Sequence, residues 1–166
     1  MKTFFSVDVE TNGPNPFVNN ILTIGIVVVR AGAIVDEIHI GPIKYTQPSW
    51  NPNEATMEWW KGVRDGSPEG REAYEACMTH GEGLTPTQAA LAMCSLARTN
   101  EPDVSNAIFV ANPATFDHAW IQRLLAYGDL ESPFSHRTLC IRNMMSGLTL
   151  SDLDDFGESR EANAKP

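Results

Sequence analysis

Residues 4–13, Phe-Phe-Ser-Val-Asp-Val-Glu-Thr-Asn-Gly, predict a β-strand whose end carries two acidic side chains. Successive side chains of a strand point to opposite faces, so Asp8 and Glu10 share one face while the apolar residues between them share the other. Two neighbouring carboxylates repel each other and resist the loss of water. A hard divalent cation such as Mg²⁺ relieves this conflict, because it binds carboxylate oxygens, water and phosphate together. The pair therefore predicts half of a metal site for phosphate chemistry, although an edge strand with a solvated acidic tip fits the same residues.

The composition predicts a single domain, 1–166, of ordinary soluble globular character, with 42% hydrophobic residues and a net charge of −9. No apolar run approaches the ~20 residues of a membrane-spanning helix. The first residues do not follow the pattern of a signal peptide, so we expect a cytoplasmic protein with no membrane partner. The negative charge disfavours broad binding to duplex nucleic acid, which needs a basic surface. A small cleft in which metal ions supply the positive charge is still compatible with it.

The order of the hydrophobic patterns predicts an α/β fold of the ribonuclease H-like class, with a mixed central sheet. After the first strand, two β-branched or alternating runs are joined by a short turn, so the first three strands form an antiparallel meander. Helices and parallel strands follow. The predicted strands after the first are 21–29, 34–40 and 107–111, and a short strand-to-helix passage lies within 135–145.

Helix starts are marked less evenly along the chain. Thr85, Pro86 and Gln88 form a capping box with proline at the first helical position, and this helix is expected to end near Thr99. A short helix is expected at 53–60, and a surface excursion at 65–83, which holds several glycines and charges. A later helix is expected to begin with Thr115 as its cap and to extend from Phe116 to about Tyr127.

Asp117 stands at the head of the apolar stripe of that later helix. It lies four, seven and eight residues before Ile121, Leu124 and Leu125, which is the spacing of a face turned to the core. An acidic residue in the first turn is favoured by the helix dipole, but the dipole explains the position along the helix and not the inward direction. The inward direction is explained if Asp117 meets Asp8 and Glu10 across shared metal ions.

Asp-x-Glu-Thr at the end of the first strand, followed later by Phe116-Asp117 at a helix start, resembles the DEDD superfamily (DEDDh type) of 3′→5′ exonucleases. Proofreading exonucleases, oligoribonuclease and RNase T belong to this superfamily. Thr56-x-x-Trp59-Trp60 resembles more narrowly its phage and mycobacterial exoribonuclease-like branch. The resemblance extends over roughly residues 3–145.

The resemblance implies a two-metal mechanism with Mg²⁺ or Mn²⁺, in which ions about 4 Å apart serve an in-line displacement at phosphorus. Asp8 would bridge both ions, and Glu10 and Asp117 would complete the site. The substrate would be the 3′ end of single-stranded RNA or DNA. Thr11 and Asn12 lie where such enzymes contact the terminal nucleotide. For Trp59 and Trp60, core packing and base stacking are both open, and we expect one ring to pack while the other faces the cleft.

The final motif of the superfamily, a His or Tyr base followed by a fourth carboxylate, is not recognisable in this sequence. We therefore expect a truncated form of a longer exonuclease that is inactive or weak as it stands. His118 and His136 are candidate bases only by default, and the acids at 152, 154 and 155 fit a solvated segment better than a fourth ligand. A non-catalytic nucleic-acid-binding or interaction module on the same fold, and a ribonuclease H-like endonuclease, are the alternatives. A homodimer is compatible with a flat tryptophan-bearing surface.

Overall fold

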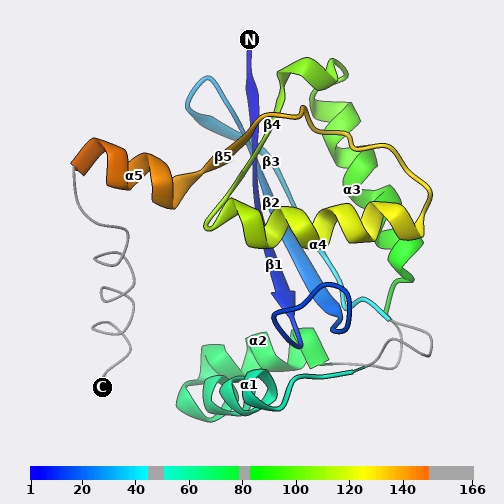
Figure 1. Ribbon diagram of the computed structural model, residues 1–166, viewed down its shortest axis with the longest axis vertical. Coiled ribbons are helices and arrows are strands. Elements are labelled where there is room, and N and C mark those ends of the chain that lie inside the picture. Colours follow the sequence, from blue (N-terminus) through cyan, green and yellow to red (C-terminus); the bar gives the residue numbers. More distant parts are fainter. Residues whose placement is uncertain (45–50, 79–82, 150–166) are drawn as a thin grey trace.

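The computed structural model of this chain describes residues 1–44, 51–78 and 83–149. Over these residues a mixed sheet is flanked by helices on one face, and a further pair of helices lies at one end of the sheet (Figure 1). The strands are β1 (Thr3–Thr11), β2 (Ile21–Arg30), β3 (Ala33–Ile40), β4 (Ala107–Ala111) and β5 (Thr138–Cys140). The helices are α1 (Glu54–Gly66), α2 (Pro68–Met78), α3 (Pro86–Asn100), α4 (Ala114–Tyr127) and α5 (Ile141–Thr149), with a short 3-10 turn at Val104–Asn106.

The sheet has the strand order β3-β2-β1-β4-β5. The pairs β1–β2 and β2–β3 are antiparallel, whereas β1–β4 and β4–β5 are parallel. This arrangement confirms the predicted α/β class, with an antiparallel three-strand meander followed by helices and parallel strands. The strands predicted from β-branched runs agree with β2, β3 and β4 to within one residue. The passage predicted at 135–145 contains β5 and the start of α5.

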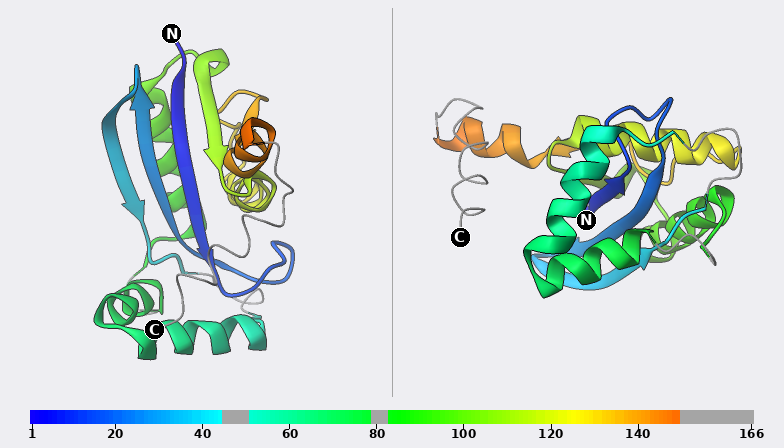
Figure 2. Two further views of the ribbon diagram at one scale, coloured as in Figure 1. Left: turned by 90° about the vertical axis from the view of Figure 1, so that its left-hand side faces the viewer. Right: turned by 90° about the horizontal axis from the view of Figure 1, so that it is seen from below.

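The hydrophobic core lies between the sheet and the helices α3 and α4. In the left view of Figure 2, α3 passes behind β2 and β3, and the opposite face of these strands is turned to the viewer. Alternation along β1 sends Phe5, Val7 and Val9 into this core, where each is at most 5% exposed. The apolar stripe of α4 meets them with Ile121 and Leu124, both fully buried. The other face of β1 carries Phe4, Ser6, Asp8 and Glu10, so its acidic residues stand at the end of the strand.

The helices α1 and α2 pack on each other at the end of the sheet where β1 finishes (Figure 1). A second small cluster of buried residues, Leu22, Trp60 and Cys77, joins this pair to β2. The surface excursion predicted at 65–83 contains a helix that was not predicted, α2, whose residues are mostly exposed. The hydroxyl of Ser67 accepts a hydrogen bond from the Gly70 N–H (2.9 Å), and Pro68 stands at the first helical position, so the segment contains a helix start of ordinary chemistry.

Two other helix starts were predicted from caps, with different outcomes. The capping box of Thr85 and Gln88 is present as predicted, and α3 extends to Asn100. The prediction that Thr115 caps α4 is wrong, because α4 begins two residues earlier, at Ala114, with Pro113 at the cap position and no side-chain hydrogen bond. Thr115 is thereby moved inside the first turn. None of the helices in the described ranges is long and apolar enough to cross a membrane.

Candidate active site

The two acids of β1 lie on the face of the sheet opposite to the core. Their intervening neighbour Val9 is 5% exposed and packs inward, whereas Asp8 is exposed and Glu10 is half-buried. This alternation is the one expected from the strand pattern. Asp8 pairs with Gly25 on β2, and Glu10 pairs with Thr23 just before a register shift at the end of the strand. The acids therefore stand where the regular sheet ends and a loop begins.

Asp117 reaches the same strand from α4. Its side chain is 2% exposed, and its Oδ1 accepts a hydrogen bond from the backbone N–H of Val9 at 3.1 Å. The parallel pairing of β1 with β4 stops at Ser6 and Val110, so the N–H of Val9 lies beyond the last β4 partner. The Asp117 carboxylate takes the place that a further strand carbonyl would have, which explains its inward direction. Asp117 therefore lies against the backbone between Asp8 and Glu10.

The three carboxyl groups influence one another electrostatically. Burial, followed by the charges of Asp8 and Asp117, raises the pKa of Glu10 to about 7. Burial also raises the pKa of Asp117 to about 6, with a further contribution from Asp8, although the hydrogen bond from Val9 acts in the opposite direction. Near neutral pH this corner of the molecule therefore holds repelling, partly protonated acids. Strong pKa perturbation of this origin is characteristic of functional sites.

The donor chemistry of this acid cluster fits a hard divalent ion, because all three side chains offer carboxylate oxygens. The side chains do not form a ready-made cage: among the described residues, no group of three or more His, Cys, Asp or Glu is placed to hold a metal ion. The metal-ligand roles of Asp8, Glu10 and Asp117 thus stay a prediction. The acids at 152, 154 and 155, considered above as a fourth ligand, lie outside the described residues.

Thr11 and Asn12 follow the acids directly, and both are built into the structure of the loop. Asn12 is fully buried, and its Oδ1 accepts a hydrogen bond from the Asn20 N–H at 2.6 Å. The Thr11 hydroxyl donates to the Gly13 carbonyl at 2.8 Å. A nucleotide could not reach the Asn12 side chain in this structure. Asn12 is thus placed to position the loop beside the acids, and the predicted contact of Thr11 and Asn12 with the terminal nucleotide stays a prediction.

The two tryptophans of α1 have separate environments. Trp60 is 2% exposed, and its indole N–H donates to the Thr11 carbonyl at 3.0 Å. Trp59 is 58% exposed, and its ring meets that of Trp60 edge to face at 4.9 Å. One ring packs, as predicted, and the other is open to solvent; that Trp59 faces the substrate cleft stays a prediction. Trp60 ties α1 to the strand end that carries the acids, so the exposed Trp59 is held near the same end of the sheet.

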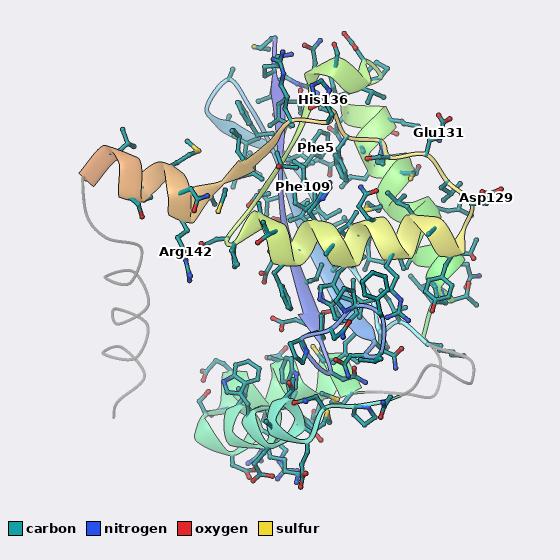
Figure 3. All side chains as sticks on the ribbon, in the orientation of Figure 1. Phe5, Phe109, Asp129, Glu131, His136 and Arg142 are labelled. Carbon is teal, nitrogen blue, oxygen red and sulfur yellow. The ribbon has the colours of Figure 1, made fainter. Side chains whose placement is uncertain are left out.

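Neither histidine considered as a default base is placed with the acids. His136 precedes β5 and lines a pocket with Lys2, at the end of the sheet where β1 begins (Figure 3). The His118 ring packs edge to face on Phe109 at 5.2 Å and lines a pocket between α4, β5 and α5 that contains none of the three acids. Burial lowers the pKa of His118.

The sequence reasoning did not single out His39, which lines a pocket together with Asp8. The sequence did contain one sign of its position: the alternation of residues 34–40 puts His39 and Glu37 on one face of β3. The pairing of β3 with β2 had to be known before that face could be related to Asp8.

No protein-family model and no curated protein matches the chain. Solved structures do match it, among them those of exonuclease I from E. coli. The complex of that enzyme with single-stranded DNA and zinc aligns with a TM-score of 0.62 at 14% identity, over 87% of this chain and 29% of that one. The complex with a 5cy-dA13 oligonucleotide gives a TM-score of 0.64 at 14% identity, over 89% and 30%. The product-bound structure of exonuclease I gives a TM-score of 0.62 at 14% identity, over 87% of this chain and 31% of that one.

At this identity the likeness establishes the fold: the mixed sheet with its flanking helices is that of exonuclease I and agrees with the predicted ribonuclease H-like class. The chain spans about a third of the length of the exonuclease I chains that it matches. The narrower resemblance to phage and mycobacterial exoribonucleases is not tested by these matches and stays a prediction.

Proposed function

We propose that this chain is the catalytic domain of a metal-dependent 3′→5′ exonuclease that acts on single-stranded nucleic acid. The observation that carries the proposal is the coupling of Glu10 and Asp117 with Asp8, on a fold shared with an exonuclease. Burial and neighbouring negative charge raise the pKa of Glu10 and of Asp117, which is costly to the fold when these groups are ionised, and a divalent cation would relieve that cost. The likeness to exonuclease I gives the cluster a chemical context that composition alone does not.

In this proposal Asp8, Glu10 and Asp117 hold Mg²⁺ or Mn²⁺, which when bound supplies charge neutralisation at the phosphate and a more acidic water. The chain's own residues fix the geometry around them. The Val9 N–H donates to one oxygen of Asp117 and fixes this carboxylate against the backbone between Asp8 and Glu10. Glu10 is half-buried, so water is partly excluded where the charges meet.

The substrate contacts are proposed at the same end of the sheet. Trp59 offers an exposed indole on which a base of a flexible single strand can stack. Thr11 lies between Trp60 and the acids and would border the terminal nucleotide. The matched structures of exonuclease I contain single-stranded DNA oligonucleotides, which makes single-stranded DNA the first substrate to test.

The test is incubation of a 5′-labelled single strand with Mn²⁺ and the wild-type chain or Asp8→Asn. Because neither default base lies with the acids, we expect a weak ladder that shortens from the 3′ end, absent with Asp8→Asn and present with Glu72→Gln, which removes an exposed acid of α2. Equal ladders from the wild type and Asp8→Asn would contradict the assignment. The same assay with a labelled RNA of equal sequence decides whether DNA or RNA is the better substrate, since recognition of RNA depends on its 2′-hydroxyls.

A non-catalytic nucleic-acid-binding module is the second candidate. It is favoured by the positions of His118 and His136, which leave the acids without either of the default bases. Loss of a catalytic base costs roughly 10²–10⁴-fold in rate. Binding of the labelled strand without any shortening, at high protein concentration and with Mn²⁺ present, would favour the module over the enzyme.

A further inference from the structure

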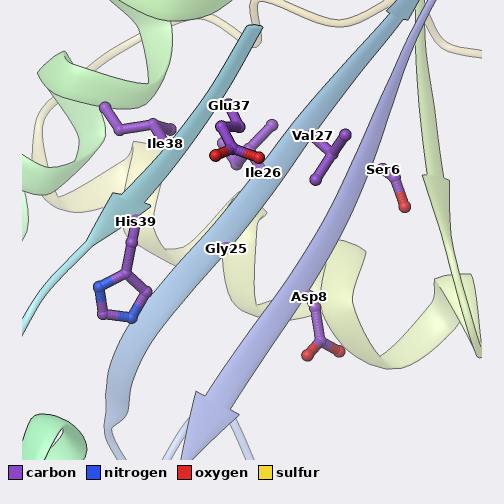
Figure 4. Close-up of a pocket in the computed structure, with 8 residues that line it drawn as sticks. All are labelled: Ser6, Asp8, Gly25, Ile26, Val27, Glu37, Ile38 and His39. Atoms are coloured by element: carbon purple, nitrogen blue, oxygen red, sulfur yellow. The ribbon is translucent and has the colours of Figure 1, made fainter. Parts of the chain in front are cut away.

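A cavity of about 420 Å³ lies on the open face of the sheet, between Asp8 on β1 and His39 on β3 (Figure 4). Its centre is Gly25, which pairs with Asp8 on one side and with His39 on the other. The next row across the sheet contributes Val27 and Glu37. The volume is at the small end of the range of ligand pockets, which is roughly 300–1,000 Å³.

Two features of the sequence create this cavity. Gly25 has no side chain, and a Cβ built there would approach only the Asp8 carbonyl oxygen, at 4.0 Å. A register shift next to Val28 leaves Val35 without a partner on β2, so that His39 and not Ile38 lies opposite Gly25. Since neighbouring strands are about 4.8 Å apart, the backbones of Asp8 and His39 are separated by roughly 10 Å over an open floor.

The chemistry of the walls selects the kind of ligand. Asp8 and Glu37 carry carboxyl groups, so a phosphate group would be repelled from the cavity. Gly25 and Val27 offer an apolar floor, and the exposed imidazole of His39 offers a flat face. A neutral planar ring that carries N–H donors satisfies all of these groups together. Nucleobases have this character, and carboxylates accept hydrogen bonds from their exocyclic amino groups.

We propose that this cavity is a nucleobase subsite that prefers bases with an exocyclic amino group, with His39 as the stacking residue and Glu37 as the acceptor. The inference rests on the proposed function, because it places a base of the single strand beside Asp8. His39 is a specificity-determining residue in this proposal and takes no part in the hydrolysis. Cytosine, adenine and guanine would be preferred to uracil and thymine.

The experiment is an NMR titration of the full chain, without metal, with deoxycytidine and with deoxyuridine. These nucleosides carry no phosphate, and they differ in the amino or carbonyl group at one ring position and in the proton on the adjacent ring nitrogen, so only deoxycytidine offers an exocyclic amino group. The ring signal of His39 is assigned by its loss in His39→Ala. We expect deoxycytidine to shift this signal, and deoxyuridine to bind roughly fivefold more weakly or worse. Glu37→Ala should bring the two affinities together.

Gly25→Val provides the steric test, because valine suits a strand and its side chain would fill the cavity. Gly62→Val is the control, at an exposed position where a Cβ meets nothing within 4 Å. We expect Gly25→Val to abolish the His39 shift and Gly62→Val to retain it. Should Gly25→Val fail to fold, loss of binding in the surface variant His39→Ala, followed through the remaining protein signals, supports the proposal.

An unshifted His39 signal, equal affinities for the two nucleosides in the wild type, or undiminished binding by folded Gly25→Val would each overturn the inference. The experiments distinguish a failure of this subsite proposal from a failure of the proposed exonuclease function. A 3′ ladder with Mn²⁺ but no nucleoside response of His39 refutes only the subsite. A His39 response without any ladder supports the subsite and counts against catalysis.

Discussion

Replacement of Asp117 by asparagine should stabilise this protein at alkaline pH while it removes the proposed metal ligand. The side chain is buried and accepts the Val9 N–H, and an asparagine oxygen can accept the same bond. What asparagine lacks is the negative charge. Because the pKa of Asp117 is raised to about 6 by burial and by Asp8, the ionised carboxylate opposes folding.

The size and the pH range follow from that pKa. The folded state holds the Asp117 proton up to about pH 6, whereas the unfolded chain releases it near 3.8, so the wild type loses stability as the pH rises through this interval. At 1.36 kcal/mol for each pH unit, the full loss is at most roughly 3 kcal/mol. The raised pKa of Glu10, about 7, extends the decline to slightly higher pH. We expect Asp117→Asn to gain about 1–3 kcal/mol at pH 8 and well under about 1 kcal/mol at pH 4.

Urea unfolding in EDTA, at pH 4 and at pH 8, measures the free energies directly. Asp117→Ala should gain less than Asp117→Asn, because alanine leaves the Val9 N–H without its acceptor. Glu72→Gln controls for the loss of one exposed negative charge and should change little at either pH. The reasoning is refuted if Asp117→Asn is no more stable than the wild type at pH 8, or if its gain is the same at both pH values.

Trp60→Phe should lower the free energy of unfolding by about 1–2 kcal/mol, because it removes the buried indole bond to the Thr11 carbonyl. Trp59→Ala should leave that free energy within about 0.5 kcal/mol of the wild type but weaken binding of a labelled single strand by about 1–3 kcal/mol in fluorescence anisotropy. If Trp59→Ala binds the strand as the wild type does, this ring does not stack on a base. Thr85→Ala should cost about 1 kcal/mol through loss of the α3 capping box, whereas Thr87→Ala, exposed in the same first turn, should cost clearly less in the same urea experiment.

Much of the fold could be predicted because its strands are marked locally. β-branched runs identified β2 and β4, and alternation on β1 assigned Asp8 and Glu10 to one face before any partner strand was known. The inward direction of Asp117 followed from its position in the apolar stripe of α4. Each of these inferences depends on a period of two or of 3.6 residues, which a single sequence displays.

Two helix starts, those of α2 and α4, were not predicted correctly, because the local sequence marks them only weakly. The glycines and charges of 65–83 suggested a surface excursion and hid the helix α2, although Ser67 and Pro68 provide a helix start and α2 packs on α1. At α4 the cap was misassigned by its chemistry, because Thr115 is a better capping residue than Pro113 and yet the helix begins before it. At α4 the helix start therefore does not follow local capping propensity.

The cavity beside Asp8 shows why the site could not be completed from the sequence. Ala31 and Gly32 both have positive φ and form a tight two-residue turn between β2 and β3. Regular pairing from that turn would place Ile38 opposite Gly25 and direct His39 to the other face. One extra residue, Val35, reverses this assignment. A one-residue shift of register is invisible in composition and in periodicity, and it decides which side chains face Asp8.

Calorimetric titration with Mn²⁺ tests whether the three acids form one metal site. The ion is titrated into the wild type and into Asp117→Asn at pH 6.5, in two buffers of different ionisation enthalpy. The pKa values of Glu10 and Asp117, about 7 and about 6, leave both partly protonated at this pH, so binding must displace protons into the buffer. We predict proton release with the wild type, and affinity weaker by roughly tenfold or more with Asp117→Asn. Equal affinity of the two proteins, with no protons released, would contradict a shared metal site at Asp8, Glu10 and Asp117.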